Sequence, residues 1–364
     1  MSLISWSGRV TLPGISGSAA PLIGRCAAMP TCLSGFKVYL SLPPVARGML
    51  GTEMSDRSRL AVADGHVDLI YMLERHAPDA RFLDLRQGGL TPATLAQGNV
   101  ALLVCALYCE DIYNGAERAW PRLQNLMRQA DRRLAGMPRF FSATEPESSR
   151  RPAVAFLLEN SDALLEADWE MIEGWGLRVA GLTHAGGNRL ADGNAICAPR
   201  GLTERGRSVV KKMASRGWCL DLAHLSPPAF FQALDLYDGQ VFSSHTGLRR
   251  FCDRARNLDE EQLRALVSAG GIVGLSPAPE MLTGGAASLE DMVMQVDWLV
   301  QRFGPKAVAL GSDYGGFEGD CHGLEDHSCW PHLANSLAAL GYPAEATEDI
   351  LGGNWLRIYN GLRL

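Results

Sequence analysis

Residues 63–68 read Ala63-Asp64-Gly65-His66-Val67-Asp68 and close an apolar run that begins at Leu60. In an extended strand, residues two positions apart point to the same face, so the side chains of His66 and Asp68 lie together. An imidazole beside a carboxylate can bind a divalent metal such as zinc. An isolated pair of this kind is more often a hydrogen-bonded histidine and aspartate. A metal site therefore requires further ligands from elsewhere in the chain.

The composition is typical of a large globular chain and gives no sign of a basic surface that would bind polyanions. A length of 364 residues suits one large α/β barrel or two ordinary domains, and a hydrophobic share of 47% is ample for a core. Charged residues make up 20% and the net charge is -6, so we expect no nucleic-acid partner. No apolar run reaches the roughly 18 residues of a transmembrane helix. We expect a soluble chain that acts on a small molecule or peptide.

Cysteine usage and the N-terminal segment bear on the compartment. The nine cysteines include no Cys-x-x-Cys pair, which favours reduced thiols. Residues 1–59 are rich in Gly, Pro and Ser but lack the pattern of a secretory signal. Within them, Gly8–Leu12 and Phe36–Leu42 alternate like short strands. We expect a cytoplasmic protein with an N-terminal extension over residues 1–59.

From Leu60 onward, short apolar runs alternate with longer segments of helical periodicity. Continuous apolar runs of this length are typical of strands buried on both faces, as in a parallel sheet. Repeated strand-then-helix units predict a (β/α)8 barrel over residues 60–364, with a doubly wound open sheet as the alternative. The eight runs are Leu60–Asp68, Val100–Tyr108, Val154–Glu159, Val179–His184, Trp218–His224, Val241–His245, Gly271–Ser276 and Ala307–Asp313.

Helical periodicity predicts crossover helices between these runs. Two of them begin with capping signals, since Thr203 precedes Glu204 and Asp259 precedes two glutamates. The expected helices include Ala116–Ala135, Asp168–Trp175, Thr203–Arg216, Pro228–Leu236, Asp259–Ala269, Leu289–Phe303 and Pro331–Leu340.

Six of the eight runs end in side chains that bind metals or move protons. In a barrel, the carboxyl ends of all strands meet on one face, where active sites are built. Because the chain has only eight histidines, such a gathering is improbable by chance. The side chains are His66, Asp68, Glu159, His184, His224, His245 and Asp313.

Five of these residues favour a site for two metals. His224 and His245 lie on neighbouring strands, and Glu159 and the pair His66 and Asp68 complete the set. Five ligands exceed one tetrahedral site, which suggests two ions that share a carboxylate and activate water between them. Glu159 is the natural bridge, because a carboxylate has two oxygens whereas an imidazole has one free nitrogen.

Other residues leave alternatives open. His184 precedes an Ala-Gly-Gly turn and could be a sixth ligand, an oxyanion stabiliser or a structural residue. Asp313 could be a general acid/base that faces the metals or a turn residue. One arginine of the basic run 249–256 could bind a substrate carboxylate. The cysteines and histidines between Cys321 and His332 hint at a structural zinc site, although their spacing fits no standard pattern.

A series of short motifs runs through the barrel region in a fixed order. As an ordered set they resemble the membrane dipeptidase family, also called renal dipeptidases, whose members are dizinc (β/α)8 enzymes of amidohydrolase type. The motifs are Asp64-Gly65-His66-Val67-Asp68, Glu159, Gly181-Leu182-Thr183-His184, Gly201-Leu202-Thr203 with Gly206-Arg207, Asp221-Leu222-Ala223-His224, Ser244-His245, Arg256-Asn257-Leu258, Gly311-Ser312-Asp313 and Gly352-Gly353-Asn354-Trp355-Leu356-Arg357.

The resemblance implies a metal ligand set of two Zn2+ per chain. His66 and Asp68 would bind one zinc, and Glu159 would bridge it to a second. His224 and His245 would hold that second zinc. The resemblance also implies a homodimer.

The resemblance implies roles in catalysis and substrate binding as well. His184 would polarise the substrate carbonyl, Arg256 would bind the C-terminal carboxylate of the substrate, and Asp313 would act as acid/base.

Three departures from the family pattern concern substrate choice. Asn160-Ser161 follows the bridging acid where the family has two glycines, and Tyr314-Gly315-Gly316 follows Asp313 where the family has an aromatic residue and Asp-Gly. The loop Ala185–Asp192 lacks the Cys-Asn and Trp elements of the family. The metal set itself is complete.

The sequence thus predicts a binuclear zinc dipeptidase that hydrolyses free dipeptides, with L,D-dipeptides and dehydrodipeptides among the candidates, by attack of a metal-bridging hydroxide. One alternative is another amidohydrolase-type metal hydrolase that acts on an N-acyl amino acid, lactam or lactone. The other is a catalytically silent barrel that binds a ligand.

Overall fold

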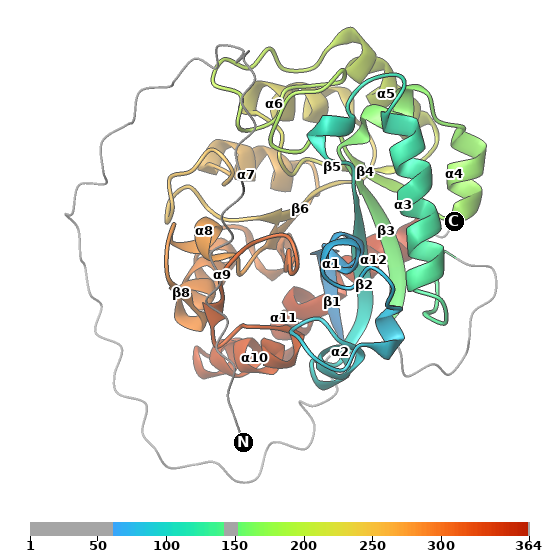
Figure 1. Ribbon diagram of the computed structural model, residues 1–364. Helices are drawn as coiled ribbons and strands as arrows, with labels where there is room; N and C mark the ends of the chain where they lie inside the picture. Colours follow the sequence, from blue (N-terminus) through green and yellow to red (C-terminus); the bar gives the residue numbers. More distant parts are fainter. Residues whose placement is uncertain (1–60, 142–151, 363–364) are drawn as a thin grey trace, which may run out of the picture. The chain divides into compact units, whose positions relative to one another are not determined.

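The computed structural model describes residues 61–141 and 152–362. Its main feature is a sheet of eight parallel strands, whose spatial order follows the sequence (Figure 1). Each of the eight predicted runs overlaps one of these strands, which confirms the predicted β/α repeat. The strands are β1 Val62–Val67, β2 Val100–Tyr108, β3 Ala153–Glu159, β4 Val179–Gly181, β5 Cys219–Asp221, β6 Val241–Thr246, β7 Ile272–Leu275 and β9 Val308–Leu310.

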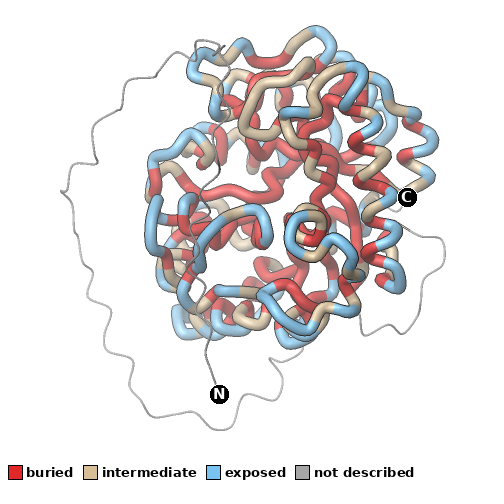
Figure 2. The backbone as a smooth tube through the Cα atoms, viewed as in Figure 1, coloured by how far each residue is buried: buried red, intermediate tan, exposed pale blue. Residues whose placement is uncertain are grey.

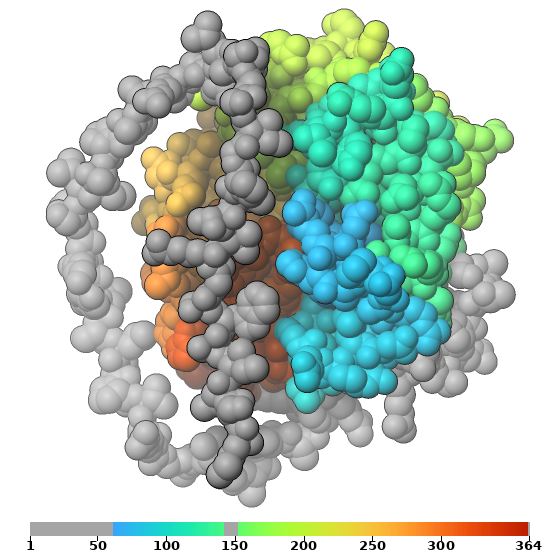
Figure 3. Space-filling view, in the orientation of Figure 1, coloured from blue at the N-terminus to red at the C-terminus, as the bar shows by residue number. Residues whose placement is uncertain are grey.

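The first strand and the segment after the last strand meet and nearly close the sheet into a barrel. The amide of Asp313 donates to the carbonyl of His66 at 2.9 Å, and the amide of Asp68 donates to the carbonyl of Tyr314 at 3.0 Å. Val67 and Tyr314 form a parallel bridge. In the space-filling view the blue and the orange-red parts of the chain adjoin accordingly (Figure 3). The alternative of a doubly wound open sheet is therefore wrong.

Helices cover the outside of the strands, with their buried sides inward (Figure 2). The predicted caps are present: the Thr203 side chain accepts from the amide of Gly206, and Asp259 forms a capping box with Gln262. Among the described residues, no helix is long and apolar enough to cross a membrane. The helices are α1 Leu69–His76, α2 Pro92–Gln97, α3 Ala119–Arg133, α4 Trp169–Trp175, α5 Glu204–Ser215, α6 Pro227–Leu236, α7 Glu260–Ser268, α8 Pro279–Leu282, α9 Leu289–Phe303, α10 Trp330–Ala339, α11 Ala344–Glu348 and α12 Asn354–Gly361.

The last helix, α12, belongs to the core inside the barrel. Trp355 packs in one buried cluster with side chains from the strands, and its indole N–H donates to the carbonyl of Leu310 at 2.7 Å. A Cβ atom at residue 65 would lie 2.1 Å from the Trp355 ring, so Gly65 is required by this close approach. The tryptophan therefore sits directly beside the strand that carries His66.

One small sheet was not predicted, and the expected N-terminal strands lie outside the described residues. A second sheet pairs β8 Ala287–Ser288 with β10 Cys321–His322. Strands of two residues have no detectable sequence period, so this sheet was not predicted. The expected strands Gly8–Leu12 and Phe36–Leu42, and the N-terminal extension 1–59 as a whole, lie outside the described residues.

Candidate metal centre

The predicted metal ligands come together, buried, at the carboxyl ends of the strands. His66 lies near the end of β1 and Asp68 directly follows that strand. Glu159 is the last residue of β3 and His245 lies in β6. The described residues contain three overlapping groups able to hold a metal ion: His66, Asp68 and Glu159; Glu159, His224 and His245; and His66, His245 and Asp313. The structure thus places all five predicted ligands in one site.

The two oxygens of Glu159 face two different sets of histidines. Oε2 lies 3.8 Å from Nε2 of His66. Oε1 lies 3.0 Å from Nε2 of His224 and 3.6 Å from Nε2 of His245. This is the arrangement that a carboxylate shared by two metal ions requires, since each oxygen binds one ion.

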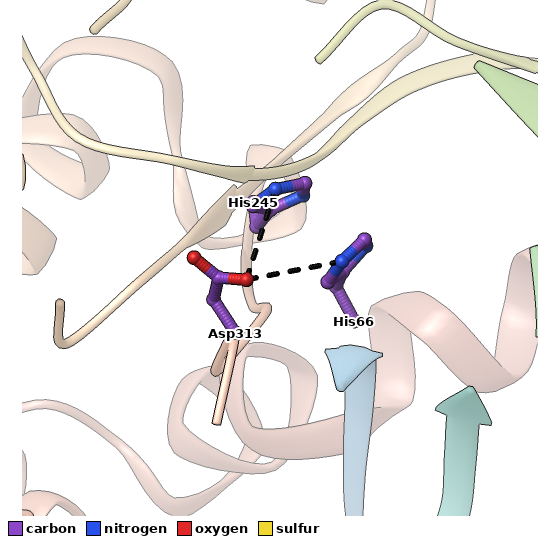
Figure 4. Close-up of side chains that lie close together, drawn as sticks. All are labelled: His66, His245 and Asp313. Atoms are coloured by element: carbon purple, nitrogen blue, oxygen red, sulfur yellow. Dashed lines mark ion pairs between the residues drawn. The ribbon is translucent and has the colours of Figure 1, made fainter. Parts of the chain in front are cut away.

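Asp313 approaches both sets of ligands from the segment after β9. Its Oδ1 lies 3.9 Å from Nε2 of His66 and 4.0 Å from Nε2 of His245, the two ion pairs drawn in Figure 4. A Cβ atom at residue 316 would lie 2.2 Å from an oxygen of Asp68 and 2.6 Å from Oδ1 of Asp313. Gly316 is therefore needed where the chain passes between these carboxylates.

The charges of the site favour bound cations. Burial and the positive charge of Arg256 lower the pKa of His66 to about 3. Burial likewise holds the pKa values of His224 and His245 well below the ordinary value, so these imidazoles are neutral. Burial raises the pKa of Glu159 well above its usual range, and the nearby carboxylate of Asp313 raises it further. Metal binding uses neutral imidazoles and ionised carboxylates, so a bound cation would offset the repulsion that now favours the protonated acid at Glu159.

Within the described part of the chain, two buried ligand atoms of this site lack a partner that a metal ion could supply. Nε2 of His66 and Oδ1 of Asp68 are buried and have no hydrogen-bond partner among the described residues. Buried polar atoms are rarely left unpaired. His66 and Asp68 belong to the same candidate metal group, so an ion bound there would give the buried His66 nitrogen a partner. Nitrogen and carboxylate oxygen are ligands that zinc accepts.

Two site residues adopt the left-handed backbone conformation. The φ angle is 63° at His224 and 62° at Asp313, in a region that costs a residue with a Cβ about 1–3 kcal/mol. The carbonyl of His224 is held by the amide of Asn194 at 2.8 Å, and that of Asp313 by the amide of Gly316 at 2.9 Å. The strands therefore end earlier than predicted: β5 stops at Asp221 and β9 at Leu310, three residues before the functional side chain.

His184 lies beside the metal ligands rather than among them. It follows the end of β4 at Gly181, and its ring centroid is 4.4 Å from that of His224. Burial and the charge of Arg256 lower its pKa to about 4. The hydroxyl of Tyr108 is 3.3 Å from Nδ1 of His184. Sequence reasoning missed Tyr108, although it ends β2 and the strand-end rule that found the other residues applies to it.

Arg256 is distinguished from the other arginines of its loop by its surroundings. Its guanidinium donates to the carbonyl of His245 at 2.8 Å, and within the described ranges it forms no ion pair. Its charge nevertheless acts on the carboxylates of the site, where it opposes the raised pKa of Asp313. Arg249 is instead paired with Asp253 at 2.6 Å, and Arg250 lies over the Trp298 ring.

The hinted structural zinc site between Cys321 and His332 is not formed, since no metal group within the described part of the chain includes these residues. His322 is exposed and pairs with Glu325 at 3.4 Å. His327 is fully buried, and its Nε2 lies 2.7 Å from the carboxylate of Asp64. His327, one of the histidines in the hinted zinc set, therefore contacts the strand that carries His66.

The departure at residue 160 strengthens the loop after β4. Asn160 has a φ of 65°, which a glycine would adopt easily and asparagine tolerates. Its side-chain amide donates to the carbonyl of Cys109 at 2.6 Å and to Asn114 at 2.9 Å. Its oxygen accepts from Asn188 at 2.7 Å. These bonds tie the segment after Glu159 to the loop Ala185–Asp192.

Comparisons with known proteins identify one family of similar chains. The family model described as membrane dipeptidase, peptidase family M19, matches residues 57–363. Dipeptidase tcpJ of Claviceps purpurea is 27% identical over 324 residues, which cover 81% of this chain and 75% of tcpJ. Dipeptidase aclJ of Aspergillus oryzae is 33% identical over 188 residues, which cover 50% of this chain but only 44% of aclJ.

A solved structure shows the same fold. The metallopeptidase of Rhodobacter sphaeroides, liganded with a phosphinate mimic of the dipeptide L-Ala-D-Ala, matches with a TM-score of 0.72 at 21% identity. The match covers 83% of this chain and 99% of that one. It confirms the TIM-type barrel.

Proposed function

The chain belongs to the membrane dipeptidase family, peptidase family M19, and on this basis we propose that it hydrolyses free dipeptides with two zinc ions bound at the carboxyl ends of the strands. The observation that carries the proposal is the orientation of Glu159, whose two oxygens face separate sets of histidines. The relatives named dipeptidase support the reaction type. The dipeptide mimic in the Rhodobacter enzyme supports the substrate class.

The ligands divide between the two ions as the resemblance implies. His66 and Asp68 would hold one zinc, His224 and His245 the other, and Glu159 both. When bound, such ions lower the pKa of water toward neutrality and so supply a nucleophile.

The remaining residues would act on the substrate and its protons. Asp313 would take the proton of the attacking water at Oδ1 and transfer it to the leaving amine. Its raised pKa, caused by burial and by Asp68, suits a group that must hold a proton during turnover. His184 would donate from its ring to the developing oxyanion.

The hydroxyl of Tyr108 would fix the tautomer of His184. Because it can donate to Nδ1, it would leave the hydrogen of the neutral ring on Nε2, where it can face the substrate oxygen. We expect Tyr108→Phe to lower kcat about tenfold, the value of one hydrogen bond of about 1 kcal/mol or slightly more, without loss of zinc. Steady-state kinetics with a zinc assay on the same sample measures both. Unchanged kcat would remove Tyr108 from the mechanism, and Tyr71→Phe, on the neighbouring ring, is the control.

Arg256 would bind the C-terminal carboxylate of the dipeptide. We expect Arg256→Met to raise KM about 10- to 100-fold for a dipeptide with a free carboxylate, since a charged hydrogen bond contributes roughly 1.5–3 kcal/mol. The activity on the amidated dipeptide should change little. Arg249→Met, which removes an arginine already paired with Asp253, is the matched control. Equal losses on the free and the amidated substrate would show that Arg256 does not recognise the carboxylate.

A substrate panel tests the proposed function against its alternatives. The zinc-loaded protein should cleave L,L- or L,D-dipeptides faster than N-acyl amino acids, lactams or lactones. Preference for one of the latter would identify a different amidohydrolase-type reaction, and zinc binding without any hydrolysis would identify a silent barrel. The homodimer and the cytoplasmic location stay predictions. Sedimentation velocity tests the first, and cell fractionation tests the second.

A further inference from the structure

One buried hydroxyl contacts ligands of both proposed metal ions. Ser244 precedes His245 in β6 and is fully buried. Its Oγ lies 2.8 Å from Nδ1 of His245 and 3.3 Å from Nδ1 of His66. The two imidazole rings are stacked with centroids 3.6 Å apart, so a single oxygen can reach both.

The third contact of this hydroxyl is a carboxylate from the neighbouring strand. Oγ of Ser244 lies 2.6 Å from Oδ2 of Asp221, the last residue of β5. The other oxygen, Oδ1, accepts from the amides of Ser244 and Ala223 at 2.8 and 3.0 Å. The main chain therefore fixes the carboxylate, and each of its oxygens has a defined partner.

The hydrogen-bonding capacity of the Ser244 hydroxyl determines the tautomers of His66 and His245. A carboxylate accepts only, so Ser244 donates its one hydrogen to Asp221 and keeps two lone pairs. Those lone pairs face Nδ1 of His66 and of His245, which must both carry hydrogen to be satisfied. In a neutral imidazole the hydrogen on Nδ1 leaves Nε2 as a free acceptor. Nε2 is the atom that each ring directs toward Glu159.

We propose that Ser244, oriented by Asp221, is a positioning residue that holds His66 and His245 in the Nδ1–H tautomer and so presents a free Nε2 to each metal ion. Such outer partners of metal-bound histidines fix ring orientation and basicity. Here one hydroxyl serves one ligand of each ion, so both ions depend on it. The inference rests on the proposed two-metal site but not on the identity of the substrate.

The chain offers a matched control in the preceding residue. Ser243 lies in the same strand and is equally buried, and its Oγ has no hydrogen-bond partner among the described residues. Ser243→Ala and Ser244→Ala therefore remove the same atom from adjacent positions. We expect Ser244→Ala to weaken zinc binding about 10- to 100-fold at both sites and Ser243→Ala to leave it within about twofold of wild type.

The experiment transfers zinc from the loaded full-length protein to a chromophoric chelator and resolves the two ions. Excess zinc should restore the kcat of Ser244→Ala to near the wild-type value, because Ser244 touches no reacting atom. A folding defect would not be reversed by zinc. Retention of both ions as tightly as in Ser243→Ala would overturn the inference, and so would weakening at one site alone.

Asp221→Asn gives a second, independent test. The amide oxygen would stay with the two main-chain donors, so its NH2 group would face Ser244 and occupy one of the lone pairs of Oγ. The hydroxyl hydrogen would then turn toward one imidazole and move that ring to the Nε2–H tautomer. We expect one zinc to be lost more readily than the other. Retention of both ions as in wild type would contradict the orienting role of Asp221.

If wild type binds two zinc ions without cleaving dipeptides, the proposed function fails. The zinc affinities of the Ser243, Ser244 and Asp221 variants still test the inference in that case.

Discussion

Glu159→Gln is expected to lower kcat/KM for a dipeptide by roughly 10³-fold or more and to release most of the bound zinc, since the metals supply most of the rate enhancement. The amide keeps one oxygen but replaces the other with a donor, so it cannot bind an ion on each side. The oxygens that face His66 and His224 would no longer be equivalent. Zinc per chain and steady-state kinetics, measured on the same preparation, report both effects.

Glu110→Gln provides the control for that substitution. Glu110 lies just after β2 and pairs with Arg122 at 2.9 Å, without contact to a metal group. It should keep its zinc and its turnover. If Glu159→Gln retained either zinc at wild-type affinity, the bridging role of Glu159 would be wrong.

Asp313→Asn is expected to lower kcat about 10²- to 10⁴-fold with both zinc ions retained, as for loss of a general acid/base. An asparagine cannot take the proton that Asp313 would transfer from water to the leaving amine. The control is Asp320→Asn, which alters an exposed aspartate of the same loop. Kinetics and zinc analysis together give the result.

The geometry makes the zinc content of Asp313→Asn informative. Asp313 lies within the group formed by His66 and His245, so it is also placed to act as a ligand. Loss of zinc in parallel with kcat would show that Asp313 binds metal rather than carrying the proton. Near-normal kcat would remove it from the mechanism.

The gathering of the candidate ligands could be predicted from sequence because barrel topology relates chain position to spatial position. His66 and His245 are far apart in the chain, but both occur near the end of an apolar run, and parallel strands bring such ends to one face. The stacked rings of these two residues are a direct consequence. No pairwise contact had to be known in advance.

Strand lengths and local backbone were less predictable. An apolar run does not reveal where regular hydrogen bonding stops, so β4 and β5 each cover only three residues in the first part of their runs. The carbonyl of His224, which has a left-handed backbone, accepts from the amide of Asn194, 30 residues earlier, and that of Asp313 accepts from the nearby amide of Gly316. Only a few per cent of residues other than glycine have a positive φ, so the presence of a His or an Asp does not predict this conformation.

The supporting residues were the least predictable part of the site. Ser244 and Asp221 are ordinary residues of buried strands, and the contacts from which we infer their role exist only once β5, β6 and His66 are in place. His327 could be noticed as a histidine but not assigned, because its partner Asp64 lies at the other end of the barrel sequence. Residues that contact a candidate ligand from a distant part of the chain show no characteristic spacing in the sequence by which they could be predicted.

Anomalous diffraction at the zinc edge from crystals of the zinc-loaded protein tests the two-metal site most directly. We expect two zinc peaks about 3.5–4 Å apart, the separation typical of two-metal hydrolytic sites. One should lie beside His66 and Asp68, the other beside His224 and His245, with one oxygen of Glu159 on each. A single peak, or two peaks of which Glu159 contacts only one, would contradict the proposed centre.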